Sequence, residues 1–231
     1  MKLYTVFTES HYEMFKEHFI KSFPFETNLE LIVKFKPQVC ASSEFHSAGW
    51  RDTMKYKVQC FIDAAYETKE GECFVFSDPD IQFFKNFSSD LLNHIQGYDA
   101  AFQNDYGGGV NTGFFIMRST PKTKAFLKTV EGNLEKFPEE QVCFNFLMQK
   151  FNDISYDKIA YRWKMLPREY WTYGELAWQR INHTNNSGTW QGHEDFNIPE
   201  NIILHHANWT SNFKNKINLL NLVRNKYNEF K

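Results

Sequence analysis

The chain has little excess charge of either sign. Its 26 Lys and Arg residues nearly balance 28 Asp and Glu residues, which leaves a formal net charge of −2 over 231 residues. Proteins that bind nucleic acid in bulk usually present a basic surface, so we expect no nucleic-acid partner. The sequence also lacks any apolar run close to the roughly 20 residues that a membrane-spanning helix requires.

Cysteine is scarce as well. Cys40, Cys60, Cys73 and Cys143 are scattered and form no Cys-x-x-Cys pair. This pattern is typical of reduced thiols in the core of a protein in a reducing compartment. Residues 1–7 form a short strand candidate followed at once by charge, which is not the pattern of a signal peptide. We therefore expect a soluble protein of the cytoplasm.

Strand-like and helix-like segments alternate along the chain as far as residue 151. This alternation predicts an α/β fold, with a mostly parallel central sheet flanked by helices on both faces. The length fits a single domain, 1–231. Short apolar runs predict strands at 3–7, 29–35, 74–77, 99–103 and 113–117, and later at 202–204. Helical spacing of apolar residues predicts helices at 12–20, 50–65, 89–95, 121–134 and 139–151.

Two carboxylates follow the most apolar of these strands. Asp78 and Asp80 lie one residue apart at its carboxyl end, and side chains at i and i+2 of an extended chain point to the same side. Open α/β sheets bind their ligands at this edge. Paired carboxylate oxygens suit Mg²⁺ or Mn²⁺ carrying a substrate phosphate. The alternative interpretation is a polar turn.

A lysine interrupts the apolar face of the helix predicted at 50–65. Lys57 lies three residues after Met54 and four before Phe61, so its amine needs either an anionic partner or a path to solvent. The partner would be a diphosphate; the alternative is a lysine that extends to the surface. Asn111-Thr112-Gly113 follows a glycine-rich turn at 107–109, and is either a ligand contact or an ordinary strand entry.

Three polar residues begin the helix predicted at 139–151. Acidic residues at Glu139 and Glu140 are favoured there by the helix dipole alone. Gln141 faces away from an apolar stripe and is therefore a candidate for a cleft. The expected stripe consists of Val142, Cys143, Phe146 and Leu147.

Late in the chain, His205 and His206 follow a predicted strand, and in an extended chain they point in opposite directions. Only one of them would reach a metal held by Asp78 and Asp80, and an imidazole beside carboxylates favours Mn²⁺ over Mg²⁺. The tail, 212–231, predicts an amphipathic helix. Its apolar stripe would pack on the core, or its basic face would touch an anionic membrane surface as a peripheral contact.

Several of these short segments occur in an order that resembles the nucleotide-diphospho-sugar transferase family, whose members are retaining glycosyltransferases with the GT-A fold. The resemblance spans roughly residues 3–216. The segments are Ser77-Asp78-Pro79-Asp80, Gln103-Asn104-Asp105, Val110-Asn111-Thr112-Gly113-Phe114-Phe115, Glu140-Gln141 and His206-Ala207-Asn208-Trp209.

The resemblance implies a metal-dependent enzyme that takes a nucleotide sugar, most often a UDP-sugar, as donor. Asp78 and Asp80 would bridge Mn²⁺ (or Mg²⁺) to the diphosphate, with His206 as a further ligand. Lys57, and Lys214 or Lys216, would contact the phosphates. The family usually has a glycine after the late histidine, whereas Ser211-Asn212 stands here, so both lysines stay open.

The resemblance also assigns the remainder of the site. Phe7 and Thr8 would lie near the nucleoside, in a nucleotide-sugar-binding half of about 1–120. Asp105, Asn111 and Gly113 would surround the donor sugar, and Gln141 would lie beneath the anomeric carbon. We expect Gln141 and Asp105 to be the catalytic pair. Glu140, at the donor site, replaces the family's usual aspartate.

The acceptor would be a glycan, a glycoconjugate or another hydroxyl compound, bound by the half at about 121–231. Aromatic side chains gather there and either stack on sugar faces or form a structural cluster. They are Trp163, Tyr170, Trp171, Tyr173, Trp178 and Trp190.

The implied reaction is transfer of a hexosyl or pentosyl group with retention of configuration. Two other interpretations fit an Asp-x-Asp motif. One is a phosphatase of the haloacid-dehalogenase type, although its motif usually lies on the first strand. The other is a non-catalytic sugar-binding module on a decayed transferase scaffold.

Overall fold

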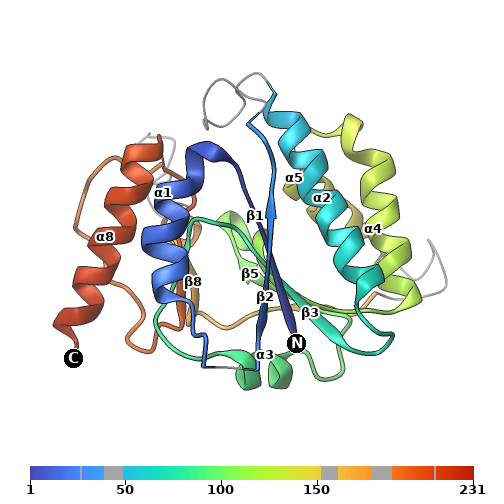
Figure 1. Cartoon of the computed structure of the whole chain (residues 1–231), viewed down its shortest axis with the longest axis horizontal. Coiled ribbons are helices and arrows are strands. Elements are labelled where there is room, and N and C mark those ends of the chain that lie inside the picture. Colours follow the sequence, from blue (N-terminus) through green and yellow to red (C-terminus); the bar gives the residue numbers. More distant parts are fainter. Residues whose placement is uncertain (27, 39–48, 152–160, 178–188, 211) are drawn as a thin grey trace.

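The computed structural model describes residues 1–26, 28–38, 49–151, 161–177, 189–210 and 212–231. A six-stranded sheet forms its centre, with helices on both faces (Figure 1). The sheet has the order β2-β1-β3-β6-β5-β7. Its strands are β1 (Lys2–Phe7), β2 (Glu30–Phe35), β3 (Cys73–Ser77), β5 (Ala100–Asn104), β6 (Val110–Arg118) and β7 (Trp163–Met165).

The mostly parallel sheet that the sequence predicts is present, with one reversal. β6 runs antiparallel to both of its neighbours, β3 and β5. The cause is the short glycine-rich connection between β5 and β6, which includes the 3-10 turn Tyr106–Gly108. Gly107 and Gly108 adopt positive φ angles of 67° and 79°. A turn this short reverses the chain, whereas a parallel neighbour requires a long crossover.

Three helices cover one face of the sheet: α2 (Trp50–Glu67), α4 (Pro121–Asn133) and α5 (Glu140–Phe151). A 3-10 turn, Leu134–Lys136, follows α4. Phe61 on α2 and Phe144 on α5 are buried against this face. The predicted stripe of α5 is partly wrong, because Val142 and Phe146 are 38% and 45% exposed. Its buried residues are Cys143, Phe144, Leu147 and Met148.

The opposite face carries a short helical run and α3 (Ser88–His94). The run consists of the 3-10 turn Glu9–His11, α1 (Tyr12–Met14) and the π-helical turn Phe15–Ile20. Phenylalanine rings dominate the packing on this side, with Phe19 edge-on to Phe83 at a centroid distance of 5.1 Å.

A second, three-stranded sheet has the order β4-β9-β8, from β4 (Ile81–Phe83), β9 (Leu204–His206) and β8 (Tyr170–Thr172). β9 thus begins two residues later than the predicted strand and includes both histidines. It pairs antiparallel with β4, so that Ile81 lies opposite His206. This pairing brings the far end of the chain beside the residue that follows Asp80.

The last described helix, α8 (Phe213–Glu229), packs its apolar stripe on a third cluster of buried residues. The Asn212 side chain caps it by accepting a hydrogen bond from the Asn215 N–H at 2.8 Å. Leu220, Val223 and Tyr227 are buried. A membrane contact through its basic face stays a prediction. Among the described residues, no helix has both the length and the hydropathy needed to cross a bilayer.

Candidate functional site

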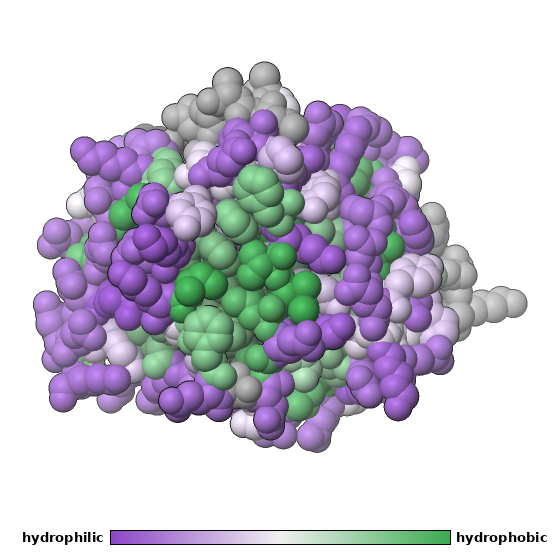
Figure 2. All heavy atoms as spheres, viewed as in Figure 1, coloured by the Kyte–Doolittle hydropathy of each residue, from purple (hydrophilic) through white to green (hydrophobic). Residues whose placement is uncertain are grey.

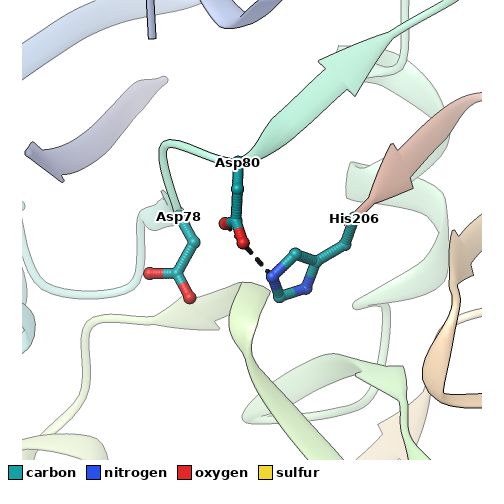
Figure 3. Close-up of side chains that lie close together, drawn as sticks. All are labelled: Asp78, Asp80 and His206. Atoms are coloured by element: carbon teal, nitrogen blue, oxygen red, sulfur yellow. Dashed lines mark ion pairs between the residues drawn. The ribbon is translucent and has the colours of Figure 1, made fainter. Parts of the chain in front are cut away.

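Asp78, Asp80 and His206 converge at one point of the molecule (Figure 3). The two aspartates occupy the turn between β3 and β4, and His206 arrives from β9. Each residue offers one ligand atom, and these atoms lie within 4.8 Å of one another. His206 Nε2 lies 3.2 Å from Asp80 Oδ1. The neighbouring His205 points the other way, where its ring stacks on Trp171 at 4.9 Å.

This donor set fits a divalent metal ion. Two carboxylates and one imidazole nitrogen are ligands that Mn²⁺ accepts, and Nδ1 of His206 is buried with no hydrogen-bond partner among the described residues. Gly113 on β6 lies directly beside the cluster. A Cβ at Gly113 would lie 2.7 Å from Asp78 Oδ2 and 2.8 Å from Asn111 Oδ1, and would also overlap the His206 ring. The absence of a side chain at Gly113 therefore leaves room for the ligands.

Two lysines neutralise the carboxylates. Lys57 Nζ lies 2.8 Å from Asp78 Oδ2 and 3.1 Å from Glu140 Oε1, while Lys216 Nζ donates to Asp80 Oδ2. Burial alone would lower the pKa of Lys57, but the two carboxylates overcome it and raise that pKa above its usual range. The sequence thus correctly predicts that this amine needs an anionic partner, and the partners here are protein carboxylates.

The pKa values of the two aspartates shift in opposite directions. Burial raises the pKa of Asp78, and the facing charge of Asp80 adds to the effect against the Lys57 ammonium. Burial also favours the neutral form of Asp80, but Lys216 and His206 overcome it and hold its pKa well below its usual range. Of the two candidate lysines, only Lys216 reaches this cluster. Lys214 is exposed and does not line the cavity.

A cavity of about 480 Å³ opens above the cluster and is lined from both halves of the chain. The predicted residues Phe7, Thr8, Lys57, Asn111, Glu140, Lys216 and the proposed ligands all line it. Gly113 lies behind the ligands.

Asp105 lies at the end of β5 and is held by three side-chain donors. Gln141 Nε2 donates to its Oδ2 at 2.5 Å, while Asn208 Nδ2 and Trp209 Nε1 donate to its Oδ1 at 3.1 and 3.0 Å. Gly174 makes room for this arrangement, because a Cβ there would overlap Asp105 Oδ1. The two predicted catalytic residues are therefore in direct contact.

The amide of Gln141 is fixed at both ends. Its Oε1 accepts the Thr112 N–H at 3.2 Å, while its Nε2 is bound to Asp105. The neighbouring Glu140 accepts the Thr112 hydroxyl at 3.1 Å in addition to Lys57. Asn111 Oδ1 accepts the Gly113 N–H at 2.7 Å. The start of α5 and the start of β6 thus form one hydrogen-bonded unit.

The other end of the cavity is aromatic. Phe7 stacks on Phe15 at 4.7 Å, and Thr8 Oγ1 lies 2.8 Å from His11 Nδ1. The His11 ring meets Phe213 edge-on at 5.7 Å. Burial, with the nearby Lys216 ammonium, lowers the pKa of His11 to about 4, so this imidazole is neutral at neutral pH.

Several residues that line the cavity are not predicted from the sequence. His11 and Phe213 belong to no recognisable sequence motif. Glu139 is explained at the sequence level by the helix dipole, yet it lines the cavity. Burial, Glu140 and Asp105 raise its pKa to about 7. Trp209 lies within the segment His206-Ala207-Asn208-Trp209 that carries the family resemblance. Its hydrogen bond to Asp105 and its positive φ of 53° are visible only in the structure.

The aromatic residues of the second half that the structure describes are packed into the core clusters and do not form an open sugar platform. Tyr170, Trp171, Tyr173 and Trp190 are each at most 2% exposed. Trp163 packs against the main core, and Trp178 lies outside the described residues. Within the described residues, Trp209 is the tryptophan of this half that lines the cavity beside Asp105.

The comparison with protein families agrees with this geometry. A sequence model of the nucleotide-diphospho-sugar transferase family matches residues 32–220. The chain belongs to this family. No curated protein matches the transferase by sequence.

Solved structures of glycosyltransferases share the fold of this transferase. One, involved in the glycosylation of the major capsid of PBCV-1, has a TM-score of 0.56 at 12% identity, over 96% of this chain and 98% of that one. Mouse xyloside xylosyltransferase 1 in its apo form has a TM-score of 0.50 at 11% identity, over 92% and 100%. Apo GlyE from Streptococcus pneumoniae TIGR4 has a TM-score of 0.56 at 9% identity, over 100% and 64%.

At these low sequence identities, the similarity to the solved structures shows the fold alone, which is of the GT-A type. The expected fold class is thereby confirmed, and the match of the family model confirms the expected family. The division into a donor half and an acceptor half, and the role of each site residue, stay predictions.

Proposed function

We propose that this chain is a metal-dependent retaining glycosyltransferase, which moves a hexosyl or pentosyl group from a UDP-sugar to a glycan or another hydroxyl acceptor. The observation that carries the proposal is the meeting of Asp78, Asp80 and His206 beside two lysines, in a cavity of a nucleotide-sugar transferase fold. Donor, metal and stereochemistry each go beyond the family assignment.

Asp78, Asp80 and His206 would hold the metal, with Mn²⁺ preferred to Mg²⁺ because one donor is an imidazole. A bound divalent ion would stabilise the negative charge on a departing diphosphate. Lys57 and Lys216 supply positive charge at the same place, since both already lie against the ligand carboxylates. Glu140, which contacts the same amine, would keep Lys57 in position beside a bound ion.

Retention would result from attack on the face of the anomeric carbon that the diphosphate leaves. The bond from that carbon to the diphosphate oxygen breaks, and the acceptor oxygen bonds to the same face. The acceptor's hydroxyl proton passes to the departing phosphate oxygen, so no separate base is required. Gln141 is a poor nucleophile, and its amide is already bound at both ends. We therefore assign it to stabilising the oxocarbenium-like centre, with Asp105 fixing its orientation.

The aromatic end of the cavity suits the nucleoside. Phe7 and Phe213 provide apolar surfaces, and Thr8 and the neutral His11 provide polar contacts. The acceptor would enter on the side of Glu139 and Trp209. A cytoplasmic location and a peripheral membrane contact through α8 complete the proposal.

The first experiment measures UDP binding by calorimetry, with and without Mn²⁺. We expect binding that requires the ion and that is lost in Asp80→Ala. Asp52→Ala is the matched control, because Asp52 is exposed on α2 and does not line this cavity. Tight, metal-independent UDP binding by Asp80→Ala would contradict the metal site.

The second experiment screens a panel of nucleotide sugars for metal-dependent hydrolysis. Hydrolysis of a UDP-sugar, stimulated by Mn²⁺ and lost in Asp80→Ala, is the expected result. Release of phosphate from a simple phosphomonoester would favour the phosphatase interpretation instead. Absence of both hydrolysis and Mn²⁺-dependent stabilisation by UDP would favour the non-catalytic sugar-binding module.

A further inference from the structure

The outer edge of the main sheet carries an exposed apolar surface that the catalytic proposal does not use. β2 is the terminal strand of the sheet. Around it, Phe25 is 61% exposed, Tyr12 51%, Phe35 48% and Val33 41%. Figure 2 shows hydrophobic side chains gathered over β2, between α1 and α2. An apolar patch of this kind on a water-facing surface typically marks an interaction site.

The backbone of β2 is also available on this edge. Glu30 N–H donates to Met1 O at 2.9 Å, and Lys36 N–H donates to Phe7 O at 3.0 Å. Backbone groups alternate in direction along a strand, so Leu31, Val33 and Phe35 direct theirs away from β1. Phe35 O accepts the Tyr56 hydroxyl at 3.5 Å. No described strand pairs with the outward groups of Leu31 and Val33, and such an edge is a template for another strand.

The sequence of this edge is complementary to itself. We propose that β2 pairs antiparallel with β2 of a second copy of this chain, about a twofold axis beside Ile32. In this register Leu31 lies opposite Val33, and Ile32 lies opposite its own copy. Glu30 lies opposite Lys34, twice across the axis.

The charges of Glu30 and Lys34 favour the antiparallel orientation, and they favour a second copy of this chain as the partner. Glu30 and Lys34 would form a non-hydrogen-bonded pair, the type in which opposing side chains approach most closely. Opposite charges across such a pair stabilise it, and like charges destabilise it. Lysines on an edge strand normally discourage pairing, but here the partner strand supplies a glutamate for Lys34. A twofold contact uses the same patch on both copies, so one sequence satisfies both sides.

The test is a charge exchange followed by sedimentation over a range of concentrations. The wild type should form dimers at roughly 100 μM, and Glu30→Lys should weaken dimerisation about tenfold or more, because two like-charged pairs replace two opposite ones. Combining Glu30→Lys with Lys34→Glu should restore the dimer. Within one chain Lys34 meets Glu67 at 3.7 Å, and an exposed pair of this kind contributes little.

A substitution within the apolar patch, compared with a control substitution outside it, tests whether the patch contributes to dimerisation. Phe35→Lys should also weaken the dimer, whereas Phe230→Lys, at a side chain that is 59% exposed near the end of α8, should not. Circular dichroism verifies that each variant is folded. A chain that stays monomeric, a dimer indifferent to Glu30→Lys, or a failure of the exchanged pair to restore association would each overturn the proposal. None of these readouts depends on transferase activity.

Discussion

Replacing Gly113 by alanine should damage the proposed metal site while leaving the fold intact. Ordinary van der Waals contact to a Cβ begins at 3.4 Å, whereas Asp78 Oδ2 would lie at 2.7 Å and Asn111 Oδ1 at 2.8 Å. The Asp78 carboxylate must therefore retreat by about 0.7 Å, and the His206 ring by more. Metal–ligand distances tolerate only about 0.2 Å, so two of the three proposed ligands leave their positions together.

The loss should appear as weaker Mn²⁺ binding in the presence of UDP. Disturbing the partners of metal ligands alone costs about 10- to 100-fold in affinity, and Gly113→Ala displaces the ligands themselves. We therefore expect a loss of about 100-fold or more, equivalent to about 2.8 kcal/mol. Overpacking should also cost roughly 1–3 kcal/mol in the free energy of unfolding. Calorimetric titration measures the first effect, and urea denaturation measures the second.

Gly132→Ala is the matched control. Gly132 lies in α4, and a Cβ there would have no atom within 4 Å. This substitution should leave Mn²⁺ binding unchanged and stabilise the helix by about 0.5–1 kcal/mol. Mn²⁺ affinity equal to that of the wild type in Gly113→Ala would refute the reasoning, because the ligands would then lie elsewhere or yield without cost.

Three further predictions concern the same cavity. The pKa of Glu139 is raised from 4.5 to about 7, so ionisation of this residue destabilises the fold as pH rises through this window. Glu139→Gln should therefore equal the wild type in stability below pH 4.5. Above pH 7 it should exceed the wild type by about 1–2 kcal/mol, after allowance for partial exposure, in denaturant titrations across pH. Gly174→Ala should lower the hydrolysis rate with unchanged UDP affinity, because its methyl group would overlap Asp105; weaker UDP binding at an unchanged rate would count against this role. Lys57→Met leaves the buried Glu140 and the partly buried Asp78 without their cation and should cost roughly 3–5 kcal/mol in the free energy of unfolding. Lys55→Met, at an exposed pair, should cost close to nothing, and equal melting temperatures for the two variants would contradict the assignment.

Local chemistry allowed the cluster of Asp78, Asp80 and His206 to be expected from the sequence. Alternation along an extended chain predicts that Asp78 and Asp80 share a side and that His205 and His206 do not. Both expectations hold, since only His206 faces the aspartates. The need of a buried amine for negative charge likewise anticipates an anionic partner for Lys57.

The features of the site that could not be predicted from the sequence depend on contacts between segments that are distant in the chain. The reversal of β6 follows from a turn whose geometry is set by Gly107 and Gly108, and their positive φ angles are visible only in the fold. The choice between Lys214 and Lys216 depends on the rotation of α8 against its cluster. The partners of Asp105 lie 36 and more than 100 positions away in the chain, beyond the range of any local pattern.

The contribution of α8 bears on the order in which the protein assembles during synthesis. Asp80 meets the ring of His206 and the ammonium of Lys216, and both come from segments that leave the ribosome after the main sheet and its helices. The cluster beneath α8 also needs Leu219, Leu220, Val223 and Tyr227. A domain generally folds as a unit during synthesis. Because Phe213 and Lys216 of α8 line the cavity, the nascent protein completes its binding cavity only when α8 docks.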